Sequence, residues 1–193
     1  MSVPAKRLAT AADLYAIPER RRFHEIIGGE LVQKAMPTMR HGHAQLGVGG
    51  PLREAYNRRP GARGPGGWWI VSEVEIQIEQ HELYRPDLSG WRRERLPSMP
   101  QETPILVRPD WVCEVLSRSN AANDLVKKMR VYHRAGVPHY WIVDPDGETL
   151  TVYRFTAEGY LVALAAGRGD SVRAEPFGEV EIDLESLFDA GEA

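Results

Sequence analysis

Residues 109–145 contain two apolar runs on either side of a helix-like segment, and this pattern limits the chain to few folds. The first run, 111–116, reads WVCEVL, and the second, 140–143, reads YWIV. Short apolar runs bounded by turn residues are typical of strands buried on both faces, as in parallel sheets. The pattern predicts a strand–helix–strand unit in an α/β fold. Its first strand carries one carboxylate, Glu114, and burying a carboxylate costs on the order of several kcal/mol unless it is paired or bound to a metal ion.

Strand geometry limits which other acid can accompany Glu114. Side chains alternate between the two faces of the strand at 110–116, so Asp110 shares the face of Glu114. The two lie about 13 Å apart at ~3.3 Å per residue, which is too far to share one metal ion. Asp87 belongs to a different predicted strand and could converge with Glu114 on Mg²⁺, which proteins hold with one or two carboxylates plus water and phosphate. The alternative is that Asp87 is only a turn acid after Pro86.

The segment after Glu114 predicts a helix with one lysine directed inward. Its apolar stripe consists of Leu125, Met129 and Tyr132. At about 100° per residue, Lys127 faces away from this stripe, whereas Lys128 lies roughly 60° from its centre. Asp124 precedes Lys128 by four residues, a spacing that favours an ion pair. The spacing therefore favours Lys128 for an interior role, and the alternative is a lysine that only extends its stem along the surface.

The rest of the chain predicts further elements around this unit. Residues 1–22 are expected to form an arm with a short helix at 11–17, and residues 41–56 a helix broken near Pro51. Alternating apolar residues predict a strand from 69 to 78. The remaining predictions are a strand over 84–91 in which Pro86 marks an edge or a strand start, a hairpin over 149–164, and a strand and short helix within 177–188.

Composition excludes several classes of protein. With 193 residues, 42% hydrophobic and 26% charged, the chain is expected to form one domain over 23–193 after the arm. A single cysteine, Cys113, excludes a disulfide framework and a cysteine-ligated zinc site. No signal peptide or membrane-spanning run is visible, so we expect a cytoplasmic protein with no membrane partner. The formal net charge of -3 does not favour a general nucleic-acid binder, although local basic patches also contact phosphate.

Several of these segments together resemble a known family. Pro86-Asp87, the run EVLS at 114–117, and the pattern from Asp124 to GVPHYWIVDP at 136–145 resemble the Uma-two family of bacterial endonucleases. FHEIIGGELV at 23–32 resembles the N-terminal signature of the same family. The resemblance extends over 23–188, and the block at 109–145 is its most specific part. It implies the PD-(D/E)XK superfamily and a restriction-endonuclease-like fold, with a mixed central sheet flanked by helices and, here, a C-terminal β-hairpin.

The resemblance also implies roles for individual residues. Asp87 and Glu114 correspond to the two acids that bind Mg²⁺ or Mn²⁺ and act in catalysis. The superfamily lysine normally follows the second acid by two residues, where this chain has Leu116. The resemblance implies that Lys128, on the following helix, takes its catalytic place, and the helical spacing favours the same lysine. The supporting residues are expected to be Asp124, which would orient Lys128, together with Tyr132 and Glu30, and a family histidine corresponds to His41 or His43.

The expected function is a metal-dependent DNA endonuclease that hydrolyses phosphodiester bonds. We expect a homodimer, because cutting both strands suits two-fold symmetry. Two alternatives stay open: a catalytically silent domain of the same fold that binds nucleic acid or a protein, and a phosphodiesterase for small molecules. Candidate phosphate contacts, each of which could instead be a solvated charge, are Arg58, Arg59 and Arg63, or Arg92, Arg93 and Arg95.

Overall fold

The computed structural model describes residues 7–59, 61 and 64–189. Its centre is a six-stranded mixed sheet with the strand order β10-β9-β8-β7-β6-β3. Neighbouring strands are antiparallel except for β7 and β8, which are parallel, as the strand–helix–strand prediction requires. The strands are β3 (Trp68–Ser72), β6 (Leu88–Arg92), β7 (Trp111–Val115), β8 (His139–Asp144), β9 (Thr149–Phe155) and β10 (Tyr160–Gly167). Strands β9 and β10 form the predicted hairpin.

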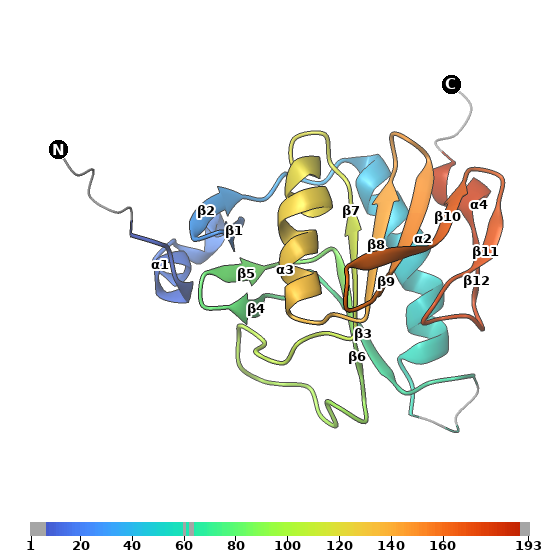
Figure 1. The fold of residues 1–193 in the computed structure, drawn as a ribbon, viewed down its shortest axis with the longest axis horizontal. Helices are drawn as coiled ribbons and strands as arrows, with labels where there is room; N and C mark the ends of the chain where they lie inside the picture. The colour runs from blue at the N-terminus through green and yellow to red at the C-terminus, as the bar shows by residue number, and fades with distance from the viewer. Residues whose placement is uncertain (1–6, 60, 62–63, 190–193) are drawn as a thin grey trace.

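Two hydrophobic cores lie on opposite faces of this sheet. Trp111, Cys113 and Val115 of β7 pack in one core with helices α2 (Met39–Tyr56) and α4 (Leu184–Phe188). Val112, between them, belongs to a second core under helix α3 (Met129–Arg134). Figure 1 shows α3 and α2 on opposite sides of the sheet. The period-two alternation predicted for β7 is confirmed, and it places Glu114 on the α3 side.

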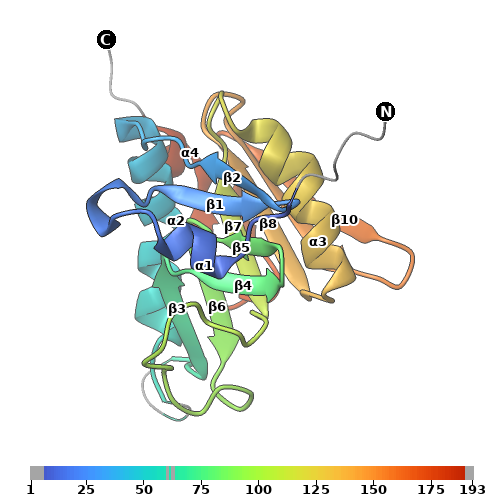
Figure 2. The same cartoon turned by 90° about the vertical axis from the view of Figure 1, so that its left-hand side faces the viewer.

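A second, four-stranded sheet covers part of the α3 side. Its order is β2-β1-β5-β4, and Figure 2 shows its strands running across the large sheet. The strands are β1 (His24–Ile27), β2 (Glu30–Gln33), β4 (Ile76–Glu79) and β5 (Glu82–Tyr84). Leu14 of helix α1 (Ala11–Tyr15) is completely buried against Ile26 and Leu83, so the described part of the predicted arm packs on this sheet. A 3₁₀ turn (Glu19–Arg21) and a small sheet of β11 (Ser171–Arg173) and β12 (Glu181–Asp183) complete the described elements.

Three predicted elements differ from the structure. The strand expected over 84–91 begins only at Leu88, because Tyr84 ends β5 of the small sheet. The single strand expected at 69–78 is wrong, because the chain turns at Glu73, which has a φ of 55°, and passes from β3 in one sheet to β4 in the other. The predicted break near Pro51 is also wrong, since α2 is continuous. Gly47 and Gly49 let this helix approach other elements closely. A Cβ added at Gly47 would lie 2.6 Å from the side chain of Leu187, and one added at Gly49 would lie 2.9 Å from that of Leu88. The close packing of α2 offsets the stability lost with the backbone hydrogen bond that Pro51 cannot donate.

The helix after Glu114 begins with a π turn (Asn123–Lys128) that continues into α3. The expected apolar stripe is therefore wrong at one position, since Leu125 is 39% exposed while Tyr132 is buried. A π turn bonds residue i to i+5, so the 100° spacing used for the prediction does not hold there. Lys128 is nevertheless buried and Lys127 exposed, as predicted. In the described part of the chain, no helix is long and apolar enough to cross a membrane.

Candidate active site

Asp87 and Glu114 lie side by side on neighbouring strands. Asp87 directly precedes β6, and the pairing of Leu88 with Cys113 brings it next to Glu114 on β7. The backbone N–H of Asp87 lies 3.4 Å from Glu114 Oε2, and both side chains are almost completely buried. Pro86 lies two residues before the start of β6, and the alternative that it marks an edge strand is wrong, because β6 lies between β3 and β7.

Asp87 is held ionised by two basic groups. Its Oδ1 lies 2.8 Å from Lys34 Nζ and 3.3 Å from His41 Nε2, while its Oδ2 accepts a hydrogen bond from the backbone N–H of Val115 at 2.7 Å. Burial by itself raises the pKa of this carboxyl, but the contact with His41 and the charge of Lys34 outweigh it and hold the pKa below its ordinary value. Asp87 is therefore an anion throughout the neutral pH range.

Lys128 lies at the centre of three buried carboxylates. Its Nζ lies 2.9 Å from Glu25, 3.0 Å from Asp124 and 3.1 Å from Glu114. Burial lowers the pKa of a lysine, but these charges outweigh it and hold the pKa of Lys128 well above its ordinary value. Lys128 is therefore a fixed ammonium rather than a base.

Glu114 itself is less easily ionised than Asp87. Burial raises its pKa well above the ordinary value, and Lys128 opposes this shift only in part. The hydroxyl of Tyr132 lies 3.3 Å from Glu114 Oε1, so the carboxyl has fixed partners on both oxygens. Its orientation toward Asp87 is set by the fold.

The charge balance of this cluster suits a divalent cation. Four buried carboxyl groups, those of Glu25, Asp87, Glu114 and Asp124, and the partly exposed one of Glu73 face two lysines and His41. At least two negative charges are left over when all five carboxyl groups are ionised. Across the described ranges, no group of three or more His, Cys, Asp or Glu is arranged to hold a metal ion. A pair of carboxylates still fits Mg²⁺ or Mn²⁺, which prefer oxygen ligands and keep several water molecules.

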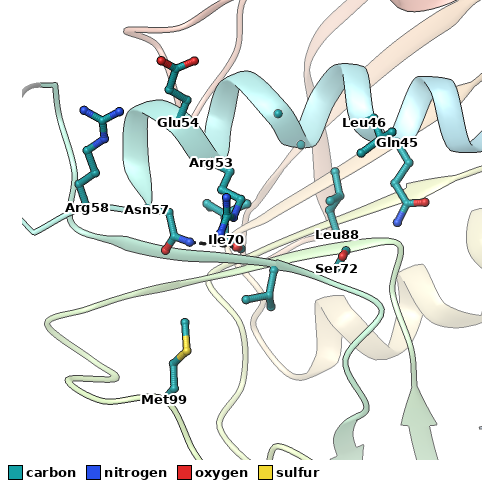
Figure 3. Close-up of a pocket in the computed structure, with 13 residues that line it drawn as sticks. Gln45, Leu46, Arg53, Glu54, Asn57, Arg58, Ile70, Ser72, Leu88 and Met99 are labelled. Atoms are coloured by element: carbon teal, nitrogen blue, oxygen red, sulfur yellow. Dashed lines mark hydrogen bonds between the residues drawn. The ribbon is translucent and has the colours of Figure 1, made fainter.

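A groove of about 1000 Å³ runs between α2 and β3. Figure 3 shows Gln45 at one end of the groove and Asn57 and Arg58 at the other, with Arg53 between them. The amide nitrogen of Gln45 donates a hydrogen bond to the carbonyl oxygen of Asp87 at 2.8 Å, which joins the groove to the site. The groove therefore borders the backbone of Asp87 and is lined by two arginines, Arg53 and Arg58, and by Glu54.

The arginines predicted to contact phosphate at 92–95 all have partners within the protein. Arg93 lies over the ring of Trp69 at 3.4 Å, and Arg95 pairs with Asp110 at 2.9 Å, so both have internal partners. Arg92 lies over Trp68 at 4.8 Å and is exposed. Arg63 lies outside the described residues. Phosphate contacts by these clusters stay a prediction.

Comparisons with known proteins show the family and the fold of this chain. A family model named Uma2, with the description "Putative restriction endonuclease", matches residues 11–185. The chain belongs to the Uma2 family. A solved structure described as a "putative nuclease belonging to DUF820 from Anabaena variabilis ATCC 29413" is similar, with a TM-score of 0.73 and 22% identity over 93% of this chain and 97% of that one. This likeness confirms the predicted fold. No curated protein matches the chain significantly.

The structure brings together most of the residues that the Uma2 resemblance implied. Asp87, Glu114 and Lys128 form the cluster, with Asp124 and Tyr132 in contact with it, although their catalytic roles stay a prediction. Of the two candidate histidines, only His41 lies at the cluster in the described part of the chain. His41 contacts Asp87, whereas His43 is exposed and its Nε2 lies 3.0 Å from the carbonyl oxygen of Ser186.

Glu30 is not in the cluster, and two other residues were missed. Glu30 is exposed at the start of β2, whereas Glu25, on the paired strand β1, contacts Lys128. Glu25 directly precedes Ile26 and Ile27. A carboxylate among the apolar residues of a predicted strand is the same pattern that indicates a buried role for Glu114. Lys34 directly follows β2, between Gln33 and Ala35, and no local pattern distinguishes it.

Proposed function

We propose that this Uma2 protein is a metal-dependent endonuclease that hydrolyses phosphodiester bonds in DNA. The observation that carries the proposal is the convergence of Asp87 and Glu114 on neighbouring strands, in a buried cluster with two lysines. A groove lined by two arginines borders the backbone of Asp87, and the family to which the chain belongs is described as "Putative restriction endonuclease". DNA is therefore favoured over a small phosphodiester as the substrate.

Asp87 and Glu114 would hold Mg²⁺ or Mn²⁺, and the other residues of the cluster prepare them for this. When bound, the ion would lower the pKa of a water molecule and stabilise the charge that develops on the phosphate. Lys34 and His41 keep Asp87 ionised. Lys128 fixes Glu114, and Asp124 and Glu25 hold Lys128 in turn. Because Lys128 stays protonated, it supplies positive charge and does not remove a proton from water.

The groove between α2 and β3 is the proposed path of the DNA strand beside the cleaved bond. Arg53 and Arg58 line the groove farther along it than Gln45, where they would contact phosphates. Gln45, at the end next to Asp87, links the position of the strand to that of the acid. Contacts to phosphate position a nucleic acid without reading its sequence, so this path implies no sequence preference.

Cleavage of supercoiled plasmid tests the proposal directly. Purified protein is incubated with Mg²⁺, with Mn²⁺ or with EDTA, and nicked and linear products are measured on gels. We expect cleavage with either ion, none with EDTA, and none by Asp87→Asn or Glu114→Gln. Asp146→Asn is the matched control, because Asp146 is an exposed acid that pairs with Arg118. Cleavage that survives both site variants would disprove the assignment of Asp87 and Glu114.

A catalytically silent DNA-binding domain is the second candidate. It is favoured by one observation: both acids already have lysine partners, at 2.8 Å for Asp87 and 3.1 Å for Glu114, so the cluster is held together by its own cations. DNA binding without cleavage of supercoiled, linear or single-stranded DNA, with either metal ion, would support this candidate over the nuclease.

A further inference from the structure

Of the two lysines in the cluster, Lys34 is the one with an ion-pair partner that is exposed to solvent. Its Nζ lies 2.8 Å from Asp87 Oδ1, 2.9 Å from Glu73 Oε2 and 2.7 Å from the carbonyl oxygen of Arg85. The side chain of Lys34 is 15% exposed, and that of Glu73 is 40% exposed. Lys34 lines the same pocket as Asp87 and Glu114. It is thus the cation of this site that solvent, or a ligand, reaches first.

Lys128 has no hydrogen to offer to a ligand. An ammonium group has three N–H donors, and those of Lys128 face three different carboxyl groups. Each of these carboxyl groups is at most 8% exposed, so none is replaced by water without leaving a buried charge unpaired. Lys128 is therefore a positioning residue for Glu114, and a phosphate needs a different cation.

Glu73 is held against Lys34 by an unusual backbone conformation. Its φ of 55° lies in the left-handed region, which residues with a side chain adopt at a cost. Its N–H donates to the carbonyl oxygen of Pro86 at 3.1 Å, so the turn is tied to the segment that carries Asp87. Both oxygens of its carboxyl group contact Lys34, at 2.9 Å and 3.0 Å. An oxyanion is thus placed on the accessible side of the lysine.

We infer that Lys34 contacts a phosphate of the bound nucleic acid, and that Glu73 is the oxyanion which this phosphate replaces. The inference rests on the proposed function. In the exchange, the ammonium of Lys34 keeps its contacts with Asp87 and the Arg85 carbonyl, and a phosphate oxygen takes the place of the Glu73 carboxylate. The exposed carboxylate of Glu73 turns into water, where it needs no protein partner. Glu73 therefore competes with the substrate and lowers its affinity.

The test measures DNA affinity without catalysis. A fluorescently labelled DNA duplex is titrated in EDTA, and the dissociation constant is followed by anisotropy at several salt concentrations. Glu73→Gln removes the competing charge, and we expect tighter binding by about two- to fivefold, the range for a partly exposed ion pair. Lys34→Met should weaken binding by about tenfold or more and lower the slope of log K against log salt by about one. Lys34→Arg should restore most of both.

Two matched variants separate these effects from a general change of charge. Glu79→Gln removes an exposed acid that pairs with Arg134, and Lys127→Met removes the exposed lysine next to Lys128. Both should bind DNA as the unmodified protein does. Because Glu73→Gln is expected to gain affinity, its result does not depend on whether Lys34→Met folds.

The outcomes distinguish this inference from the proposed function. If the protein binds and cleaves DNA, but Glu73→Gln behaves like Glu79→Gln and Lys34→Met like Lys127→Met, the inference is wrong and the nuclease stands. If the unmodified protein neither binds nor cleaves DNA, both are wrong. Tighter binding by Glu73→Gln together with a smaller salt slope for Lys34→Met supports the inference.

Discussion

Replacing Lys128 by methionine should destabilise the protein strongly. Methionine preserves most of the volume of the side chain but removes the only ammonium that contacts Glu25 and Asp124 among the described ion pairs. Removing one partner of a buried ion pair costs about 3–5 kcal/mol, because the other charge is left without compensation. Here the remaining carboxyl groups are also close to one another, which adds repulsion. We therefore expect the free energy of unfolding to fall by at least about 3 kcal/mol, a large share of the ~5–15 kcal/mol of a typical domain.

Urea denaturation at pH 7 in EDTA measures this loss. Lys127→Met is the matched control, since Lys127 is exposed on the same turn, and its free energy of unfolding should change by less than about 0.5 kcal/mol. The transition is followed by circular dichroism and by the fluorescence of the buried tryptophans. A loss below about 1 kcal/mol for Lys128→Met, the size expected of an exposed pair, would refute the description of the cluster as a buried network.

The same variant predicts a dependence on pH with a definite sign. Burial already raises the pKa of Glu114 well above its ordinary value, and it raises that of Asp124 as well. Without Lys128 both pKa values rise further. A carboxyl group with a higher pKa in the folded protein stabilises the fold below its unfolded pKa, and this contribution is lost as the pH rises through the folded pKa. The deficit of Lys128→Met should therefore be largest near pH 7 and shrink toward about pH 4. A deficit that grows on acidification would contradict this reasoning.

Three further predictions concern the metal ion, the groove and helix α2. Mg²⁺ at about ten times its dissociation constant should stabilise the protein by about 1.4 kcal/mol in thermal melts, and should have no such effect on Asp87→Asn. Arg53→Ala should weaken DNA binding alike for all sequences and lower the salt slope by about one, and an unchanged slope would exclude Arg53 from the DNA path. Gly47→Ala should destabilise the fold, because the new Cβ would lie 2.6 Å from Leu187, whereas Gly42→Ala, with nothing within 4 Å, should stabilise it by up to about 1 kcal/mol. Chemical denaturation of the two glycine variants side by side tests this, and equal effects would contradict it.

The local pattern of the chain was enough to predict the centre of the fold. The apolar runs around Glu114 specify a strand buried on both faces, and the alternation of their side chains specifies which face carries the acid. Helical spacing predicts that Lys128, and not Lys127, points inward. The structure confirms that Lys128 is buried, although part of the helix is a π turn. These features depend on residues a few positions apart, whose directions follow from backbone geometry alone.

Tertiary structure decided which distant residues meet. Glu25 and Lys34 reach the cluster because the small sheet lies across the large one, and no local pattern encodes that packing. The same holds for Glu73, whose turn splits an apparently continuous strand between two sheets. Side-chain periodicity records which face of an element is buried, but it does not record what lies against that face. Glu114 was therefore predictable from the local pattern and Asp87 from the family resemblance, whereas the cations and carboxylates that surround the two acids depend on how the two sheets pack.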